Sequence, residues 1–210
     1  MPRNPELTRY LTSLAGQDDV LAQVERETQQ LPNAGMQSRA DQAALLTILA
    51  RLLDAREAIE VGTFTGYGAI CIARGLAEGG KLTCLEVSPE FAEVARRNLD
   101  RAGVGERVTI QVGPALDSLQ AIPEVPHVDL AYVDADKTGY PAYYDLLVPR
   151  LRPGGLLVLD NTLLGERVLD PQDERSQTMH ELNARIAADE RVESVLLGLS
   201  DGVTLARKRG

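Results

Sequence analysis

The chain has 210 residues, 44% of them apolar, which suits the core of one large α/β domain and leaves little room for a second. Its 31 acidic and 22 basic side chains give a formal net charge of −9, which argues against broad binding along a nucleic-acid backbone. The N-terminal residues, Met1 to Glu6, form no apolar leader, and no run approaches the length of a membrane span. We therefore expect a soluble, cytoplasmic protein in which Cys71 and Cys84 are reduced core residues.

Hydrophobic periodicity predicts N-terminal helices followed by a regular alternation of strands and helices. Residues Asn4 to Gln30 have the pattern of one or two amphipathic helices, and Ser38 with Asp41 indicates a capping box for the next helix. That helix carries four apolar residues on one face: Leu45, Ile48, Leu49 and Leu52. Strands are then expected at 58–61, 81–87, 108–112, 128–133 and 155–159, and helices at 67–77, 90–102, 116–119, 140–151 and 176–189. A final pair of strands, 192–199 and 203–207, flanks a Ser-Asp-Gly turn and forms a hairpin.

Repeated strand–helix units predict a Rossmann-like α/β fold, with a mostly parallel seven-stranded sheet covered by helices on both faces. The terminal hairpin adds an antiparallel strand at the edge of this sheet. Ligands of such sheets bind beyond the carboxyl ends of the strands, where the strand order reverses. Glu60, Glu86, Asp134 and the pair Asp160-Asn161 all fall at strand ends, so they should converge on one cleft.

Oxygen-bearing side chains gather after two of these strands. Asp134 and Asp136 end the first, Asp160 and Asn161 end the second, and Lys137 stands three residues after Asp134. Hard divalent cations take oxygen ligands, and a lysine beside such a cation can be held as a neutral base. The pattern predicts metal-assisted chemistry on an oxygen-rich substrate. Two simpler interpretations remain open: the Asp-Asn pair as a turn after a strand, and Asp136 as a cap of the following turn.

The first strand–helix turn indicates the cofactor. Its glycines, at positions 62, 66 and 68, do not follow the G-x-G-x-x-G pattern of dinucleotide-binding proteins. Glu60, just before the first glycine, suits a cationic or amino-bearing cofactor better than a pyrophosphate. Glu86 lies 24 residues after Gly62 and can accept both hydroxyls of a ribose. Together these features point to S-adenosylmethionine (SAM), although a glycine turn that only packs helix on strand is the plainer alternative.

Six motifs in register now carry a resemblance: E-V-G-T-F-T-G-Y from residue 60, L-E-V-S-P, V-G-P-A, V-D-A-D-K-x-x-Y, G-G-L-L-V-L-D-N-T-L and the terminal D-G-V-T. The chain resembles the cation-dependent O-methyltransferases of the caffeoyl-CoA and catechol type, in particular their compact bacterial members. The resemblance extends from about Met36 to Arg207. It implies one SAM-dependent methyltransferase domain over residues 1–210, with N-terminal helices in 1–35 and the catalytic core in 36–210.

The resemblance also implies roles for individual residues. Asp134, Asp160 and Asn161 match the ligands of a divalent cation, of which Mg²⁺ fits best while Mn²⁺ and Ca²⁺ stay open. Lys137 matches the general base that takes the proton of the acceptor hydroxyl. Asp136 and Tyr140 are candidates for substrate contact. The expected SAM-binding positions are Met36, Ser38, Glu60, Gly62, Phe64, Gly68, Glu86, Val87, Ala115 and Asp134.

The implied reaction is methyl transfer from SAM to a hydroxyl of a small catechol or vicinal diol, in a protein that is usually a homodimer. Leu164 and Gly165 replace the tryptophan and its neighbour of many relatives, and no insertion that would hold coenzyme A is evident. Gly68 stands where many relatives have a serine that binds the methionine carboxylate. One alternative acceptor is the hydroxylated wobble uridine of tRNA, which the net charge disfavours. Two further alternatives are a NAD-linked dehydrogenase and a non-catalytic SAM-binding scaffold.

Overall fold

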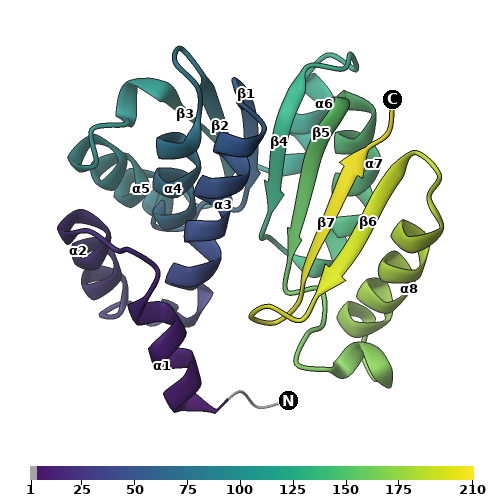
Figure 1. Cartoon of the computed structure of the whole chain (residues 1–210), viewed down its shortest axis with the longest axis horizontal. Helices are drawn as coiled ribbons and strands as arrows, with labels where there is room; N and C mark the ends of the chain where they lie inside the picture. Colours follow the sequence, from purple (N-terminus) through teal and green to yellow (C-terminus); the bar gives the residue numbers. More distant parts are fainter. Residues whose placement is uncertain (1–3) are drawn as a thin grey trace.

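A seven-stranded sheet forms the centre of the computed structural model, which describes residues 4–210 (Figure 1). The strand order is β3-β2-β1-β4-β5-β7-β6, and every neighbouring pair from β3 to β5 is parallel. The strands are β1 (Glu57–Val61), β2 (Lys81–Glu86), β3 (Val108–Val112), β4 (Val128–Val133), β5 (Leu151–Asp160), β6 (Val192–Leu197) and β7 (Val203–Lys208). The order reverses between β1 and β4, so the crevice for a ligand is expected beside the ends of these two strands.

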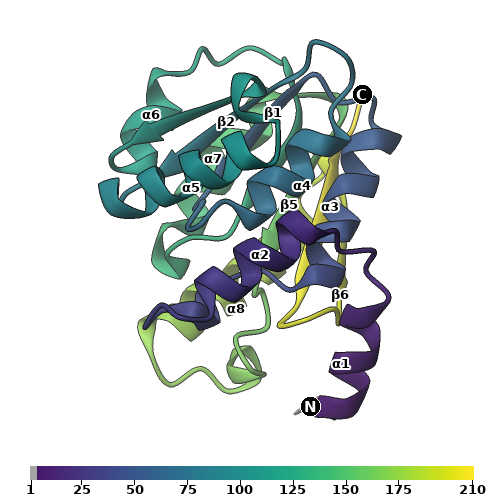
Figure 2. The ribbon, with the colours of Figure 1, turned by 90° about the vertical axis from the view of Figure 1, so that its left-hand side faces the viewer.

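Helices cover both faces of the sheet, as the alternating pattern predicts (Figures 1 and 2). The helices are α1 (Pro5–Ser13), α2 (Asp19–Thr28), α3 (Ala40–Leu52), α4 (Tyr67–Gly75), α5 (Pro89–Arg101), α6 (Ala115–Ala121), α7 (Tyr140–Arg150) and α8 (Glu174–Ala188). Four short 3-10 turns, η1 to η4, lie at Ala34–Met36, Gly105–Arg107, Lys137–Gly139 and Arg167–Leu169. Within the described residues, no helix combines the length and apolar character needed to cross a bilayer.

Local sequence explains where several of these helices begin. The Asp18 side chain accepts a hydrogen bond from the amide of Leu21 at 2.9 Å, and Ser88 caps α5 directly before Pro89. Asp173 and Ser176 form a reciprocal capping box at the start of α8. These side chains satisfy amides that have no partner inside the helix.

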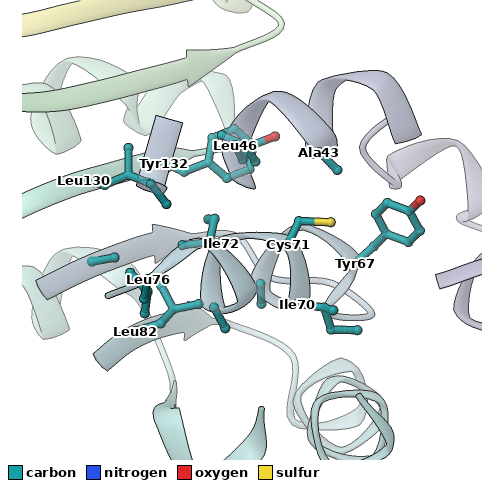
Figure 3. Packing of buried hydrophobic residues seen from close by; sticks show 14 of the residues in the cluster. Ala43, Leu46, Tyr67, Ile70, Cys71, Ile72, Leu76, Leu82, Leu130 and Tyr132 are labelled. Carbon is teal, nitrogen blue, oxygen red and sulfur yellow. The ribbon is translucent and has the colours of Figure 1, made fainter. Parts of the chain in front are cut away.

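Two buried hydrophobic clusters hold the layers together, one on each face of the sheet. Residues of α2, α3, α4 and α5 build the first cluster, in which Leu46 and Ile72 pack near Tyr132 of β4 (Figure 3). Residues of α6, α7 and α8 build the second. Because side chains alternate along a strand, Ala58 of β1 belongs to the first cluster and Ile59 to the second. This alternation directs Glu60 to the same face as Tyr132.

The start of α3 differs from the expected capping box, so that prediction is wrong. Arg39 is the residue before the helix and makes no capping bond. Asp41 accepts hydrogen bonds from the Arg39 guanidinium, and the Ser38 hydroxyl lies 3.1 Å from the Tyr132 hydroxyl. The Ser38 hydroxyl therefore bonds to Tyr132 in the sheet and does not cap the amides at the start of α3.

Only part of the apolar stripe expected on α3 packs against the core, where Leu49 is partly buried. Ala43, Leu46 and Ala50 are buried, whereas Ile48 and Leu52 are exposed. The small alanines allow α3 to lie close to α4, which explains why they occupy the inner face. The predicted hairpin is confirmed at the edge of the sheet, with β7 pairing antiparallel to β5 and β6 lying outermost. Cys71 and Cys84 are buried and free, as expected.

Candidate active site

A cleft of about 1020 Å³ lies beyond the carboxyl ends of β1, β2, β4 and β5, beside the reversal of strand order. All but one of the site residues expected from the sequence line it. Those present are Met36, Ser38, Glu60, Gly62, Phe64, Gly68, Glu86, Val87, Ala115, Asp134, Asp136, Lys137, Asp160 and Asn161. The exception is Tyr140, which is fully buried beneath the cleft.

Gly62 is required by the close approach of β1 and β4. Its φ is +86°, and a Cβ at this position would lie 2.0 Å from the carbonyl oxygen of Asp134. The amide of Asp134 in turn donates to the carbonyl oxygen of Val61 at 2.8 Å. Only glycine leaves room for this contact, so the first glycine of the turn directly positions Asp134.

Glu60 is a buried carboxyl beside the glycine turn. Burial, above all, raises its pKa from 4.5 to about 8, and nearby Asp134 and Glu86 add to the shift. The Cys84 thiol donates to its Oε2 at 3.4 Å. A Cβ at Gly68 would lie 2.8 Å from its Oε1, so the glycine at this position leaves space for the Glu60 carboxyl. A positively charged ligand in the cleft would favour the ionised form of this group.

Glu86 is the last residue of β2, and its side-chain carboxylate binds backbone amides of the glycine turn. Its Oε2 accepts hydrogen bonds from the amides of Thr63 at 3.1 Å and Phe64 at 2.7 Å, and its Oε1 accepts from Ser88 at 2.9 Å. Each carboxylate oxygen has more than one lone pair, so acceptor capacity remains for ligand hydroxyls. The carboxylate therefore both shapes the turn and presents oxygen atoms to the cleft.

Lys137 is the buried amine of the site. Its Nζ donates to Asp134 Oδ1 at 3.3 Å and to the Tyr140 hydroxyl at 2.6 Å. The Tyr140 hydroxyl faces the carbonyl oxygens of Val133 and Asp160, both at 3.0 Å, so its proton points away from the lysine. Burial lowers the pKa of Lys137, although the charges of Asp134 and Asp160 oppose the shift. Tyr140 thus positions the amine, and its burial is incompatible with the substrate contact suggested by the sequence.

Asp160 is held by a polar chain that crosses the buried side of the sheet. The Tyr132 hydroxyl donates to its Oδ2 at 3.0 Å, and this hydroxyl also meets Ser38 Oγ at 3.1 Å and the Gln42 amide at 3.3 Å. The amide of Asn161 donates to Asp160 Oδ1 at 2.6 Å. Burial, and then the charge of Asp134, raises the pKa of Asp160 to about 7.

The loop after β5 is held in place by the turn between β6 and β7. The amides of Thr162 and Leu163 donate to the carbonyl oxygens of Gly202 and Asp201, at 3.0 and 2.9 Å. The Asp201 carboxylate accepts from the amide of Gly165 at 2.6 Å. The terminal D-G-V-T motif therefore supports the segment that carries Asp160 and Asn161, in addition to forming a hairpin turn.

The arrangement of Asp134, Asp160 and Asn161 fits a hard divalent cation. Burial is the main cause of the raised pKa of Asp160, and the negative charge of Asp134 adds to it, so a cation bound between the two carboxylates would favour their ionised forms. Two carboxylates and one amide oxygen are ligands that Mg²⁺ or Ca²⁺ accepts. Among residues 4–210, no three His, Cys, Asp or Glu side chains gather as a metal-binding group, and the set here depends on the amide of Asn161.

Asp136 is committed to the backbone that follows it. Its Oδ2 accepts from the amide of Gly139 at 2.9 Å, and its Oδ1 accepts from the Tyr143 hydroxyl at 2.6 Å. It therefore caps the η3 turn that carries Lys137, which is one of the two interpretations left open by the sequence. It also lines the cleft, so a substrate contact stays a prediction.

Reasoning from the sequence missed several residues that line or support the cleft, among them Gln42, Tyr132, Arg175 and Asp201. Tyr132 carried a readable signal, because a tyrosine inside a buried strand needs a hydrogen-bond partner for its hydroxyl. Gln42, in the first turn of α3, is likewise a polar residue among apolar ones. Arg175 lies outside the motifs quoted above and reaches the cleft because α8 packs against the η3 turn.

Sequence comparison now identifies the class of protein that this fold and cleft define. The O-methyltransferase family model matches residues 11–209, so the chain belongs to the O-methyltransferase family, as its motifs indicate. The catechol O-methyltransferase of Mycobacterium tuberculosis is 38% identical over 176 residues, which cover 82% of this chain and 79% of that protein.

Two solved structures are similar to this chain in both sequence and fold. The O-methyltransferase TomG from Streptomyces achromogenes, involved in tomaymycin synthesis and solved with SAM, is 33% identical with a TM-score of 0.87, covering 98% of this chain and 96% of that one. The O-methyltransferase from Bacillus cereus, solved with SAH, is 31% identical with a TM-score of 0.89, covering 97% of each chain. The fold is therefore the Rossmann-like α/β fold of methyltransferases.

Proposed function

We propose that this O-methyltransferase moves the methyl group of SAM to a hydroxyl of a small catechol or vicinal diol held by a divalent cation, with Lys137 as general base. The observation that carries the proposal is one cleft in which a buried amine lies beside two carboxylates and an amide oxygen. The same cleft extends to Glu60 and Glu86, which suit a positively charged nucleoside.

The cofactor end of the cleft supports SAM binding. The Glu60 carboxyl would ionise against the positive charge of the cofactor, and Glu86 would accept hydrogen bonds from ribose hydroxyls. Gly68 and Tyr67 belong to the first turn of α4, whose amides lack partners within the helix and can bind a carboxylate. These amides would replace the serine that many relatives carry at position 68.

The proton of the acceptor hydroxyl needs a nearby base, and Lys137 is placed for this task. Its lowered pKa favours the neutral amine, and Asp134 and Tyr140 fix the position of Nζ. In the transfer, the carbon–sulfur bond breaks as the carbon–oxygen bond forms, and the hydroxyl proton moves to Nζ. SAM supplies an activated methyl group on a positively charged sulfur, so alignment of the reacting atoms accounts for much of the rate.

Asp134, Asp160 and Asn161 would hold the cation. When bound, it would supply Lewis acidity that lowers the pKa of the acceptor hydroxyl and would orient two vicinal oxygens. The hydrogen bonds from Tyr132 and from the amide of Asn161 hold the Asp160 carboxylate in a fixed orientation. A fixed carboxylate is what an octahedral Mg²⁺ site needs.

The direct test is methyl transfer from labelled SAM to a panel of catechols and matched monophenols, with Mg²⁺ and again with EDTA. We expect transfer to catechols only, and only with metal. Asp160→Ala should remove the metal-stimulated part while the variant still binds SAH in calorimetry. Equal transfer to monophenols, or transfer unaffected by EDTA, would contradict the chelating mechanism. Absence of any transfer to catechols, with labelling of tRNA instead, would move the assignment to the hydroxyuridine acceptor.

We also propose a homodimer that covers the apolar face of α1 and α3. Leu7, Tyr10 and Leu14 of α1 are exposed, as are Ile48 and Leu52 of α3, and the two helices contact each other. Sedimentation velocity of the wild type and of a Tyr10→Asp, Leu14→Asp variant tests this. A wild type that sediments as a monomer at micromolar concentration would refute it.

A further inference from the structure

Arg175 places an exposed positive charge at the acceptor end of the cleft. It lies in the first turn of α8 and lines the cleft together with Lys137 and Asn161. Throughout the described part of the chain, no side chain or carbonyl group makes a hydrogen bond or ion pair with its guanidinium. This arginine is therefore available to a ligand.

The other cations of the cleft have partners within the protein. The Arg39 guanidinium lies 2.7 Å from the Asp41 carboxylate, and Lys137 is bound by Asp134 and Tyr140. Arg175 differs from both because no carboxylate within the described residues makes a hydrogen bond or ion pair with it, although its charge acts on the exposed Asp173 two residues earlier.

The position of Arg175 separates it from the cofactor end. Glu60, Glu86 and the glycine turn lie around β1 and β2, whereas α8 packs against the η3 turn of Lys137. A group bound by Arg175 would thus belong to the acceptor and lie beyond its reacting oxygens. The guanidinium offers a planar fork of N–H donors that matches a carboxylate in two-point geometry.

We propose that Arg175 is a specificity-determining residue that binds a carboxylate on the acceptor, so that the natural acceptor is an acidic catechol. The inference rests on the proposed function and narrows its substrate class. A single carboxylate fits better than a doubly charged phosphate, because the cleft already has six acidic residues: Glu60, Glu86, Asp134, Asp136, Asp160 and Asp201. One free arginine balances one negative charge.

The test compares catechols that differ only in this charge. The probes are 3,4-dihydroxybenzoate, 3,4-dihydroxyphenylacetate and 3,4-dihydroxycinnamate, each paired with its neutral amide. For the best-fitting length, we expect kcat/KM of the acid to exceed that of the amide by about tenfold, mainly through KM, as one charge-assisted hydrogen bond allows. In Arg175→Gln this ratio should fall to about one, and Arg175→Lys should restore part of it.

Arg185→Gln is the matched control, since it removes the same charge from the same helix. Arg185 pairs with Asp145 on the surface and does not line the cleft, so the acid-to-amide ratio should stay at its wild-type value. Calorimetric titration of the SAH-bound protein with acid and amide gives a second readout that does not depend on turnover. The same preference should appear there as a ratio of Kd values.

The outcomes separate the two levels of the proposal. Equal use of acids and amides by the wild type, or an acid preference that survives in Arg175→Gln, overturns the role of Arg175 while leaving catechol methylation intact. Lack of transfer to any acid or amide refutes the proposed function itself. An acid preference lost equally in Arg185→Gln would assign it to the overall charge of α8 and also overturn the inference.

Discussion

Glu60 should make the ligand-free protein less stable as the pH rises. Its pKa is 4.5 in the unfolded chain and about 8 in the folded one, because the carboxyl is buried. A group with a raised folded pKa stabilises the native state below the unfolded value, and this contribution is lost as the pH rises toward the folded value. At pH 7 the native state holds about 0.9 of a proton that the unfolded chain has released, so the free energy of unfolding falls by about 1.2 kcal/mol per pH unit.

The variant Glu60→Gln removes this titration and keeps the shape of the side chain. Between pH 5.5 and 7.5, the wild type should lose about 2–3 kcal/mol relative to the variant, measured by urea unfolding without cofactor and with EDTA. Asp160 also has a raised pKa, but it is present in both proteins, so its contribution cancels in the difference. Parallel pH profiles for the two proteins would show that Glu60 is already ionised when folded and would refute the reasoning.

Three further substitutions test the site. Lys137→Ala should lower kcat by about 100-fold or more while the Kd for SAH stays within about twofold, and near-normal turnover would exclude Lys137 as the base. Tyr132→Phe removes the donor to the buried carboxylate of β5 and should cost about 1–3 kcal/mol in urea unfolding, whereas an unchanged midpoint would show that the bond contributes nothing. Gly62→Ala introduces a Cβ 2.0 Å from the Asp134 carbonyl oxygen and should lower Tm and SAH affinity together. Gly79→Ala, with φ +73° and open space around it, is its control: an equal loss in both variants would assign the effect to backbone strain.

The polar residues at the strand ends were the part of the site that could be predicted well from the sequence. Apolar runs that end at or beside Glu60, Glu86, Asp134 and Asp160 indicate both the strand and the polar residue at its end, and parallel strands bring these ends to one edge. The order of strands and helices followed from the same periodicity. Each of these features depends on residues close together in sequence, which is why they could be predicted.

The features that were missed depend on contacts between distant segments. Ser38 has a local capping option, yet its hydroxyl meets Tyr132, which is 94 residues away. The hydrogen bonds from the post-β5 loop to Asp201 and Gly202 likewise cross about 40 residues of chain. Nothing in local propensity distinguishes such partners from solvent, since the competing contact exists only after the sheet has formed.

The strand order has a consequence for how this protein is made. β5, with ten residues, acquires its second neighbour only when β7 docks, and β7 follows every other strand in the chain. Until then, a nascent or partly folded chain presents the unpaired backbone of an apolar strand, which is a template for aggregation. Once the hairpin has docked, β6 becomes the edge strand of the sheet, and its charged Glu193 pairs with Arg207 and Arg209. Substitutions that weaken the β6–β7 hairpin should therefore lower the yield of soluble, folded protein, even though the hairpin lies at the edge of the sheet.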